Sequence, residues 1–174
     1  MVNDEIGNTK RILLTGMSGT GKSTVIASLA ERGFDAIDVD EPEWSEEVAV
    51  PADELTGLGG GRDWVWREER VRGLLDTPGD GPLFIGGCAP NQGKFYSRLD
   101  HVILLTAPAD VIVSRLASRT NNPFGKRPDE VERVLQLKQE IEPMLRTGAT
   151  LQVDTSIPLE RVVLLVLHHT GAPC

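Results

Sequence analysis

Residues 16–23 read GMSGTGKS, and this stretch fits the pattern G-x-x-x-x-G-K-[ST] of a phosphate-binding loop. Glycines at this spacing let backbone N–H groups turn towards phosphate oxygens, while the lysine and the hydroxyl serve the β/γ-phosphates and Mg²⁺. An apolar run at residues 12–14 precedes the stretch, and Val25, Ile26 and Leu29 follow it at helical spacing. A strand, a loop and a helix in this order are the context that the pattern needs. The stretch therefore predicts a binding site for ATP with Mg²⁺.

The loop also assigns candidate ligands to the nucleotide and its metal ion. Lys22 is expected to neutralise charge on the phosphates during transfer, and Ser23 to hold Mg²⁺ through its hydroxyl. The nucleotide contacts expected from the loop and the first helical turn are Gly16, Ser18, Gly19, Thr20, Gly21, Lys22, Ser23 and Thr24.

Length and composition limit the organisation of the chain and its partners. A chain of 174 residues that is 40% hydrophobic is expected to form one domain, residues 1–174, with its own core. With 26 acidic against 18 basic residues, the net charge of −8 disfavours binding to nucleic acid and to anionic membranes. A small molecule is therefore the expected partner, and a monomer or small homo-oligomer the expected state.

Two features of the sequence predict a cytoplasmic protein. The two cysteines, Cys88 and Cys174, form no C-x-x-C pattern and no disulfide framework, which suits a reducing compartment. The first ten residues lack a charged-then-apolar signal, and the apolar run at residues 162–167 is too short to cross a bilayer. We therefore expect no membrane partner.

Strand-like and helix-like segments alternate along the chain. Apolar runs predict strands at residues 11–15, 34–40, 83–85, 101–106 and 150–154. Helical spacing predicts helices at residues 22–32, 64–75, 108–119 and 129–146, and a last helix that begins at Pro158. Pro143 is expected to bend the fourth of these helices or to end it early. The alternation favours an α/β fold, a three-layer αβα sandwich around a five-stranded parallel sheet.

Residues 41–80 interrupt this alternation. They hold an acidic stretch, the glycine-rich residues 57–61 and all three tryptophans of the chain, Trp44, Trp64 and Trp66. We interpret this part as a mobile insertion that binds the second substrate, the acceptor. The tryptophans form either a stacking wall for a ring or the small core of the insertion, and the sequence leaves both open.

Two carboxylates lie at the end of the second predicted strand, where ligands of parallel sheets bind. Asp38 and Asp40 are two residues apart, so their side chains share one face of the strand. Asp38 is expected to hold Mg²⁺ with Ser23, because the third predicted strand ends in Gly-Gly-Cys and offers no carboxylate. Asp40 is then expected to orient or deprotonate the attacking hydroxyl.

These motifs resemble those of the shikimate kinase and gluconate kinase group of small P-loop kinases, and the resemblance covers nearly the whole chain. D-V-D at residues 38–40 resembles a D-x-D whose second Asp contacts the acceptor. W-R-E-E at residues 66–69 is similar to an F-R-x-x-E segment whose arginine, here Arg67, holds the substrate carboxylate. Gly86 and Gly87 fall where the family has a glycine triplet that touches the acceptor.

The same resemblance implies residues for the base, the lid and a second acceptor contact. R-L-A-S-R-T at residues 115–120 resembles a segment whose last arginine, here Arg119, stacks on adenine. Arg127 falls in a K-R-P segment that resembles the part of the lid whose arginine reaches the phosphates. Arg146 falls near a second acceptor-binding arginine. The resemblance thus implies a P-loop kinase fold with a lid at residues 120–128.

The prediction is an ATP- and Mg²⁺-dependent kinase that moves the γ-phosphoryl group to a hydroxyl of a small acceptor. Lys22, Asp40 and Arg127 are its expected catalytic residues. An anionic acceptor is expected, because arginines pair with carboxylate and phosphate and stand out in an acidic chain; they are Arg62, Arg67, Arg70, Arg72 and Arg146. Two alternatives stay open: a nucleoside or nucleotide kinase, and a nucleotide-binding regulatory NTPase that acts through a protein partner.

Overall fold

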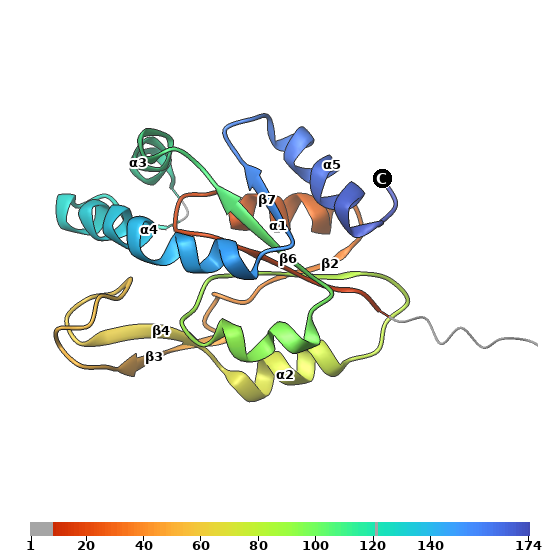
Figure 1. The fold of residues 1–174 in the computed structure, drawn as a ribbon, viewed down its shortest axis with the longest axis horizontal. Helices are drawn as coiled ribbons and strands as arrows, with labels where there is room; N and C mark the ends of the chain where they lie inside the picture. Colours follow the sequence, from red (N-terminus) through yellow and green to blue (C-terminus); the bar gives the residue numbers. More distant parts are fainter. Residues whose placement is uncertain (1–8, 121) are drawn as a thin grey trace, which may run out of the picture.

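The strand that leads into the phosphate loop, β1 (Arg11–Thr15), lies in the middle of a five-stranded sheet. The computed structural model describes residues 9–120 and 122–174, and in this part the sheet is parallel with the order β2-β5-β1-β6-β7 (Figure 1). The other strands are β2 (Asp35–Asp38), β5 (Leu83–Gly86), β6 (His101–Thr106) and β7 (Leu151–Asp154). The predicted parallel sheet of five strands is confirmed. Residues 1–8, and residue 121 of the expected lid, lie outside the described residues.

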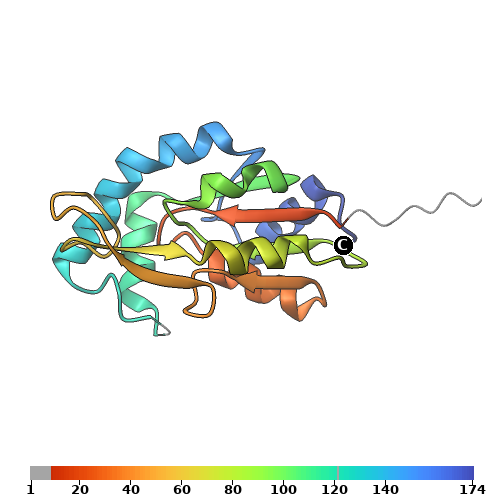
Figure 2. The ribbon, with the colours of Figure 1, turned by 90° about the horizontal axis from the view of Figure 1, so that it is seen from below.

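Helices cover both faces of this sheet and complete the three predicted layers (Figures 1 and 2). One face carries α1 (Lys22–Glu31) and α5 (Leu159–Thr170). The other face carries α2 (Glu68–Asp76), the 3₁₀ helix η1 (Gln92–Arg98) and α4 (Pro128–Gly148). Helix α3 (Ala109–Ser118) packs against α4.

The sequence of β1 shows how one strand serves two layers. Ile12 and Leu14 pack with residues of α1 and α5, while Leu13, on the opposite face, packs with Val71 and Leu75 of α2. The three β1 side chains are fully buried. Burial of such a side chain contributes roughly 1.5–3 kcal/mol. This central strand therefore fixes the position of the phosphate loop that follows it.

The insertion contains a β-hairpin that the helical spacing did not predict. Strand β3 (Ser45–Ala49) pairs antiparallel with β4 (Arg62–Trp66), and α2 begins only at Glu68. The helix predicted over residues 64–75 is thus wrong in its first turn. Alternation within Trp-Val-Trp is strand-like, but its partner strand reads SEEVA and carries little apolar signal. The pairing of β3 with β4, rather than the sequence pattern of either strand, therefore determines this part of the structure.

The hairpin gives the three tryptophans different surroundings. Trp66 is 1% exposed and packs against Phe95 in the core, with ring centroids 5.7 Å apart. Trp44 packs partly against the same core cluster. Trp64 instead lines the cavity described below. Trp66 therefore has the packing role that the sequence left open, and the role of Trp64 as a stacking surface stays a prediction.

Helix α4 continues through its internal proline. The helix runs from Pro128 to Gly148, so the expectation that Pro143 would end it early is wrong. Leu145 is buried beyond the proline, and Ile141 packs against the same cluster before it. Apolar packing on both sides holds the helix together, although the proline lacks an N–H for one helical hydrogen bond.

Replacing the exposed Pro143 by Ala is expected to raise the free energy of unfolding by about 2 kcal/mol. Proline in a helix interior costs about 3 kcal/mol relative to alanine, and the loss of its restraint on the unfolded chain returns roughly 0.4–1 kcal/mol. Urea denaturation followed by circular dichroism measures the change. Glu140→Ala, at an exposed position of α4, is the control and should change stability by less than about 0.5 kcal/mol. An unchanged or lower stability of Pro143→Ala would contradict the expectation.

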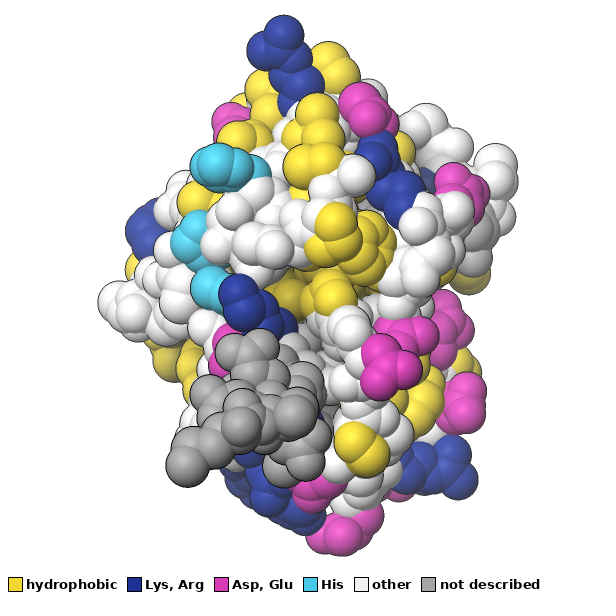
Figure 3. Space-filling model, turned by 90° about the vertical axis from the view of Figure 1, so that its right-hand side faces the viewer, with side chains coloured by type: hydrophobic (Ala, Val, Ile, Leu, Met, Phe, Trp, Pro, Cys, Tyr) yellow, Lys and Arg dark blue, Asp and Glu magenta, His cyan; other side chains and the backbone are white. Residues whose placement is uncertain are grey.

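The two ends of the sheet differ in chemistry. Figure 3 shows the face at the amino ends of the strands, where histidine side chains gather. The rings of His101 and His169 lie there with centroids 5.0 Å apart. The phosphate loop follows the carboxyl end of β1, at the opposite edge. Across residues 9–120 and 122–174, no helix has the length and apolarity to span a membrane.

Candidate active site

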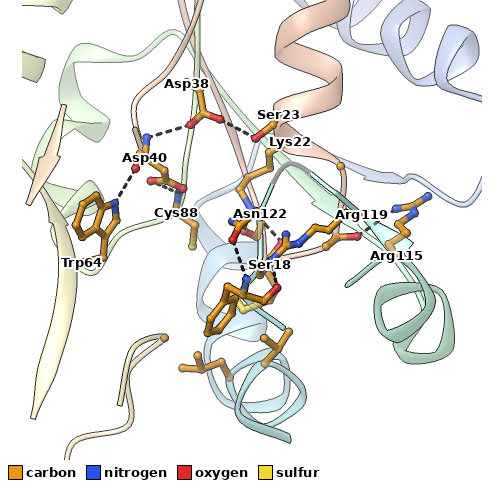
Figure 4. A pocket seen from close by; sticks show the side chains of 18 of the residues that line it. Ser18, Lys22, Ser23, Asp38, Asp40, Trp64, Cys88, Arg115, Arg119 and Asn122 are labelled. Atoms are coloured by element: carbon orange, nitrogen blue, oxygen red, sulfur yellow. Dashed lines mark hydrogen bonds between the residues drawn. The ribbon is translucent and has the colours of Figure 1, made fainter. Parts of the chain in front are cut away.

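A cavity of about 990 Å³ lies at the carboxyl ends of the strands, beside the phosphate loop (Figure 4). Its wall combines the phosphate loop, the ends of β2 and β5, the insertion, α3, α4 and the segment between these two helices. Small-molecule sites usually occupy about 300–1,000 Å³. The cavity therefore has the size and the position expected for two small substrates.

The phosphate loop has the backbone that its glycines allow. Gly16 has φ +148°, and a Cβ atom at this position would lie 2.3 Å from the carbonyl oxygen of Leu105. The loop passes into α1 through Gly21, which has φ +93°. Lys22 lies across the loop, and its Nζ donates to the carbonyl oxygens of Gly16 at 2.6 Å and Met17 at 3.0 Å. This positions the lysine charge where the phosphates of a nucleotide are expected.

Arg115 of α3 and Thr155, which directly follows β7, support the loop from behind. Arg115 donates to the Thr155 hydroxyl at 2.8 Å and to the Thr155 carbonyl at 2.6 Å. The Thr155 hydroxyl donates in turn to the carbonyl oxygen of Thr20 at 2.7 Å. Thr20 is buried and does not line the cavity, whereas the other predicted nucleotide contacts of the loop do. Thr20 thus lies in the support of the loop.

The two residues predicted to hold Mg²⁺ lie together. Ser23 donates its hydroxyl to Oδ2 of Asp38 at 2.6 Å, and Oδ1 of Asp38 accepts the backbone N–H of Asp40 at 3.0 Å (Figure 4). Hydroxyl and carboxylate oxygens beside a phosphate site are ligands that Mg²⁺ prefers. The donor set therefore fits this ion.

Asp40 is held in place by donors from two other elements. Its Oδ1 accepts Nε1–H of Trp66 at 3.0 Å, and its Oδ2 accepts the backbone N–H of Cys88 at 3.0 Å. The indole of Trp64 donates to the Asp40 carbonyl oxygen at 2.7 Å (Figure 4). Trp64 and Trp66 are two apart on β4, so the same face of the hairpin fixes both the backbone and the carboxylate.

Burial raises the pKa of Asp40 to about 6, although the charge of Lys22 and the hydrogen bonds from Trp66 and Cys88 act in the opposite direction. A carboxylate with this pKa is ionised at neutral pH, yet it is a stronger base than an exposed aspartate. Asp40 therefore has the protonation behaviour of a general base.

Gly87 makes room for this carboxylate. A Cβ atom at Gly87 would lie 2.7 Å from Oδ1 of Asp40, and one at Gly86 would lie 2.6 Å from the side chain of Ile26. Neither glycine lines the cavity, whereas Cys88, the next residue, does. Gly86 and Gly87 were expected to contact the acceptor. In this structure they lie against the side chains of Ile26 and Asp40 instead.

Three predicted arginines do not line the cavity. Arg67 precedes α2 and forms an ion pair with Glu46 at 3.1 Å. Arg146 forms an ion pair with Glu142 at 3.2 Å, on α4. Arg127 precedes α4 and pairs with Asp129, and its side chain is 74% exposed. The structure therefore does not bring these arginines to the expected acceptor or phosphates.

Arg119, by contrast, lines the cavity at the end of α3, as expected for a contact with the base. One of its terminal N–H groups donates to the carbonyl oxygen of Phe124, while Nε is buried without a hydrogen-bond partner among the described residues. Burial lowers the pKa of this guanidinium. Arg119 and the segment that it contacts, residues 122–124, therefore line the same wall of the cavity.

Several residues of the wall were not predicted individually. Trp64 and Cys88 lie directly against Asp40, and Asn122 lines the cavity near Ser18 of the phosphate loop (Figure 4). The position of Cys88 just after a buried strand was a usable signal. The apolar face of α4 also lines the cavity, with Val134 and Ile141 among its residues, but its spacing is the same as that of a core helix.

Comparison with known proteins assigns the chain to a family. The family model described as AAA domain matches residues 12–136. The chain is 32% identical over 149 residues to the shikimate kinase of Mycobacterium avium, and the alignment covers 84% of this chain and 84% of that protein. It is 31% identical over 146 residues to a nucleotide-binding protein of Thermosipho africanus, which matches 83% of this chain; the alignment spans 48% of that relative's length.

Solved structures share the fold at lower sequence identity. The shikimate kinase from Acinetobacter baumannii in complex with shikimate has a TM-score of 0.60 and 20% identity, covering 92% of this chain and 94% of that chain. A gluconokinase from Sinorhizobium meliloti has a TM-score of 0.56 and 19% identity, covering 93% and 91%. The chain therefore belongs to the AAA domain family, among the small P-loop kinases similar to shikimate kinase and gluconate kinase.

Proposed function

We propose that the protein transfers the γ-phosphoryl group of ATP to a hydroxyl group of a small-molecule acceptor. The observation that carries this proposal is Asp40, a buried carboxylate with a raised pKa that lines the same cavity as the phosphate loop. A site that only binds a nucleotide has no need for a second carboxylate beside the metal ligand. The kinase names of several relatives agree with this activity.

In the proposed reaction, the acceptor oxygen attacks the γ-phosphorus and the bond to the β–γ bridging oxygen breaks. The hydroxyl proton passes to Asp40, and ADP leaves with the bridging oxygen. Lys22 stabilises the charge that develops on the phosphate oxygens, which is the main contribution of a protein to this chemistry. Ser23 and Asp38 would hold Mg²⁺, which supplies charge neutralisation of the phosphates. Arg127 would reach the phosphates only after the lid segment closes, because its side chain points to solvent here.

An acceptor panel with coupled detection of ADP tests this proposal. Shikimate, sugar acids, nucleosides, nucleotides and amino alcohols are supplied with ATP and Mg²⁺, and ADP release is compared with the rate without acceptor. At least one class is expected to stimulate ADP release and to yield a phosphorylated product by mass spectrometry. Tight ATP binding without stimulation by any class would remove support for phosphotransfer.

Two other functions each have one observation in their favour. Trp64 lines the cavity and offers a ring on which a base would stack, which favours a nucleoside or nucleotide acceptor. The name of the Thermosipho africanus relative favours a nucleotide-binding protein that acts through a partner. The acceptor panel separates a nucleoside or nucleotide kinase from other kinases. Slow ATP hydrolysis that no acceptor changes would favour the nucleotide-binding protein that acts through a partner.

Replacing Trp66 by Phe is expected to move the acidic limb of the activity profile to higher pH by about one unit. The substitution removes the Nε1–H that donates to Oδ1 of Asp40, and a hydrogen bond to a charged group contributes about 1.5–3 kcal/mol. Because this bond favours the ionised carboxylate, its loss raises the pKa of Asp40 above about 6. The measurement is kcat/KM between pH 5 and 9.

Trp64→Phe is the matched control for this prediction. Its indole donates to the backbone carbonyl of Asp40 rather than to the carboxylate, and its ring lines the cavity. We therefore expect a higher KM for the acceptor and an unchanged acidic limb. Equal pH profiles for both variants would show that Trp66 has only a packing role.

A further inference from the structure

The basic side chains that line the cavity, within the described part of the chain, all belong to its nucleotide half. They are Lys22, Arg115 and Arg119. Lys22 donates to its own phosphate loop, Arg115 to the residue that supports this loop, and Arg119 to the segment after α3. None of the three belongs to the insertion or to the end of β5. The acceptor half, formed by Asp40, the insertion and the residues after β5, thus has no basic group of its own.

The acceptor half carries carboxylates instead. Asp40, Glu41 and Asp63 line it, and the proposed proton transfer uses only the first. In residues 9–120 and 122–174, neither Glu41 nor Asp63 forms an ion pair with a basic side chain. Partial burial raises the pKa of Asp63, and the charge of Glu54 adds to this effect. A positive charge in the cavity would lower the pKa of Asp63 and so oppose the effects of burial and of Glu54.

The rest of this half is apolar or aromatic. Leu58, Trp64 and Pro90 line it, and the hydrogen bond from the indole to the Asp40 carbonyl fixes the position of the ring. The face of an indole attracts cations as well as apolar rings. Leu58 is itself held, since its carbonyl oxygen accepts a hydrogen bond from Arg133 of α4 at 3.3 Å. The wall therefore combines an apolar surface with unpaired negative charge.

From this lining we infer that the acceptor is a hydroxyl compound that carries a protonated amino group on an apolar ring or chain. Its hydroxyl would contact Asp40, and its ammonium would lie near Asp63, Glu41 and the ring of Trp64. The acceptor class rests on the proposed phosphotransfer, but the cavity is a site on independent grounds, since the phosphate loop forms its other half. An anionic acceptor would face the carboxylates of Glu41 and Asp63, which form no ion pair among the described residues, and that of Asp40, on which the charge of Lys22 acts from the phosphate loop.

The arginines that predicted an anionic acceptor do not alter this charge. Arg67 and Arg146 do not line the cavity, and each is already paired with a carboxylate, Glu46 and Glu142 respectively. The net charge of −8 adds a long-range attraction for cations. Charge near the cavity and charge of the whole chain therefore favour the same class of acceptor.

Three probes that share a cyclohexanol ring and carry a cationic, neutral or anionic group at position 3 test the inference: 3-aminocyclohexanol, cyclohexane-1,3-diol and 3-hydroxycyclohexanecarboxylate. Binding is measured by tryptophan fluorescence and by calorimetry, with Mg²⁺ and a non-hydrolysable ATP analogue present, so that the result does not depend on turnover. We expect the amine to bind about tenfold more tightly than the diol, and the carboxylate most weakly. The preference should decrease as the salt concentration rises.

Variants that remove a carboxylate test whether the preference for the amine arises in the cavity. The double variant Glu41→Gln with Asp63→Asn is expected to lose most of the amine preference, to within about twofold of the diol, while its affinity for the ATP analogue stays the same. Asp53→Asn, in the same insertion but outside the cavity lining, is the matched control and should keep the preference. Circular dichroism confirms that each variant is folded.

The outcomes separate this inference from the proposed function. Tighter binding of the carboxylate, equal binding of the three probes, or no binding of any of them would overturn the amine assignment. An amine preference that survives in the double variant would overturn it as well. Stimulated ADP release with an anionic acceptor would contradict the inference and support phosphotransfer. Amine binding without any phosphorylated product would support the site and contradict the kinase.

Discussion

Replacement of Asp40 by Asn is expected to lower kcat for phosphoryl transfer by about 10²- to 10⁴-fold, the usual contribution of a general base. Asn has nearly the same shape, and its oxygen still accepts a hydrogen bond, but it takes no proton from the acceptor. The affinity for ATP should change by less than about twofold, because the phosphate loop is untouched. Steady-state kinetics with the best acceptor of the panel, together with calorimetric titration of an ATP analogue, measure both quantities.

The stability of the same variant relative to the wild type should rise between pH 4 and pH 8. The pKa of Asp40 is about 6 in the folded chain, against a usual value of 3.8. Between about pH 4 and pH 6 the group ionises in the unfolded state but stays protonated in the folded state, so the cost of the buried charge grows to at most about 3 kcal/mol and is constant at higher pH. Asn removes this pH-dependent cost, while at every pH its amide NH₂ faces one of the two N–H donors, Trp66 or Cys88. The stability of the variant relative to the wild type should therefore be higher at pH 8 than at pH 4.

Thermal unfolding of Asp40→Asn and wild type at these two pH values tests the combination. Asp53→Asn, which removes an exposed carboxylate, is the control for the loss of one charge. An equal stability difference between variant and wild type at both pH values would show that the pKa of Asp40 is not raised in the folded chain. Unchanged turnover would remove Asp40 from the mechanism.

Replacement of Lys22 by Met is expected to lower kcat by about 10²- to 10³-fold, as the loss of one preorganised donor to a developing charge does in other enzymes. The Nζ lies across the loop in the structure, hydrogen-bonded to two loop carbonyls. Unlike Asp40→Asn, this variant should also bind ATP more weakly, because the lysine contacts the phosphates in both the ground state and the transition state.

A change in the pH profile distinguishes this lysine from a residue that only binds phosphate. The charge of Lys22 lowers the pKa of Asp40, so its removal should raise that pKa above about 6 and move the acidic limb of the residual activity to higher pH. Lys10→Met removes a lysine at the opposite edge of the sheet, and it should leave both kcat and the limb unchanged. An unshifted limb in Lys22→Met would show that the two side chains are not coupled.

The sequence predicted the phosphate loop, and the placement of Asp38 and Asp40 beside it, because these features are local. The loop at residues 16–23 carries its geometry in its own glycines, and Asp38 and Asp40 lie at the end of β2, beside this loop. Strands β1, β5 and β6 are short apolar runs, which is the most readable pattern in an α/β chain. All of these features depend on residues close together in the sequence.

The acceptor side was predicted poorly because it depends on pairing between distant segments. Strand β3 has no apolar pattern of its own and exists through its ladder with β4, so the hairpin left no clear local signal. The motif arginines have the right residue type, yet Glu46 and Glu142 pair with Arg67 and Arg146, and only the fold reveals these pairs. The charge of the cavity could not be predicted either, because the residues that line it come from several segments that are far apart in the sequence.

The support of the phosphate loop by Arg115 and Thr155 has a consequence for the energetics of nucleotide binding. These side chains fix the carbonyl of Thr20 from outside the loop, so the loop already has its shape before a ligand arrives. Ordering a flexible segment of this length on binding would cost roughly 1–2 kcal/mol per residue in backbone entropy. Because the loop is ordered when the chain folds, nucleotide binding does not lose this entropy. The affinity for the nucleotide is therefore higher than it would be with a flexible loop.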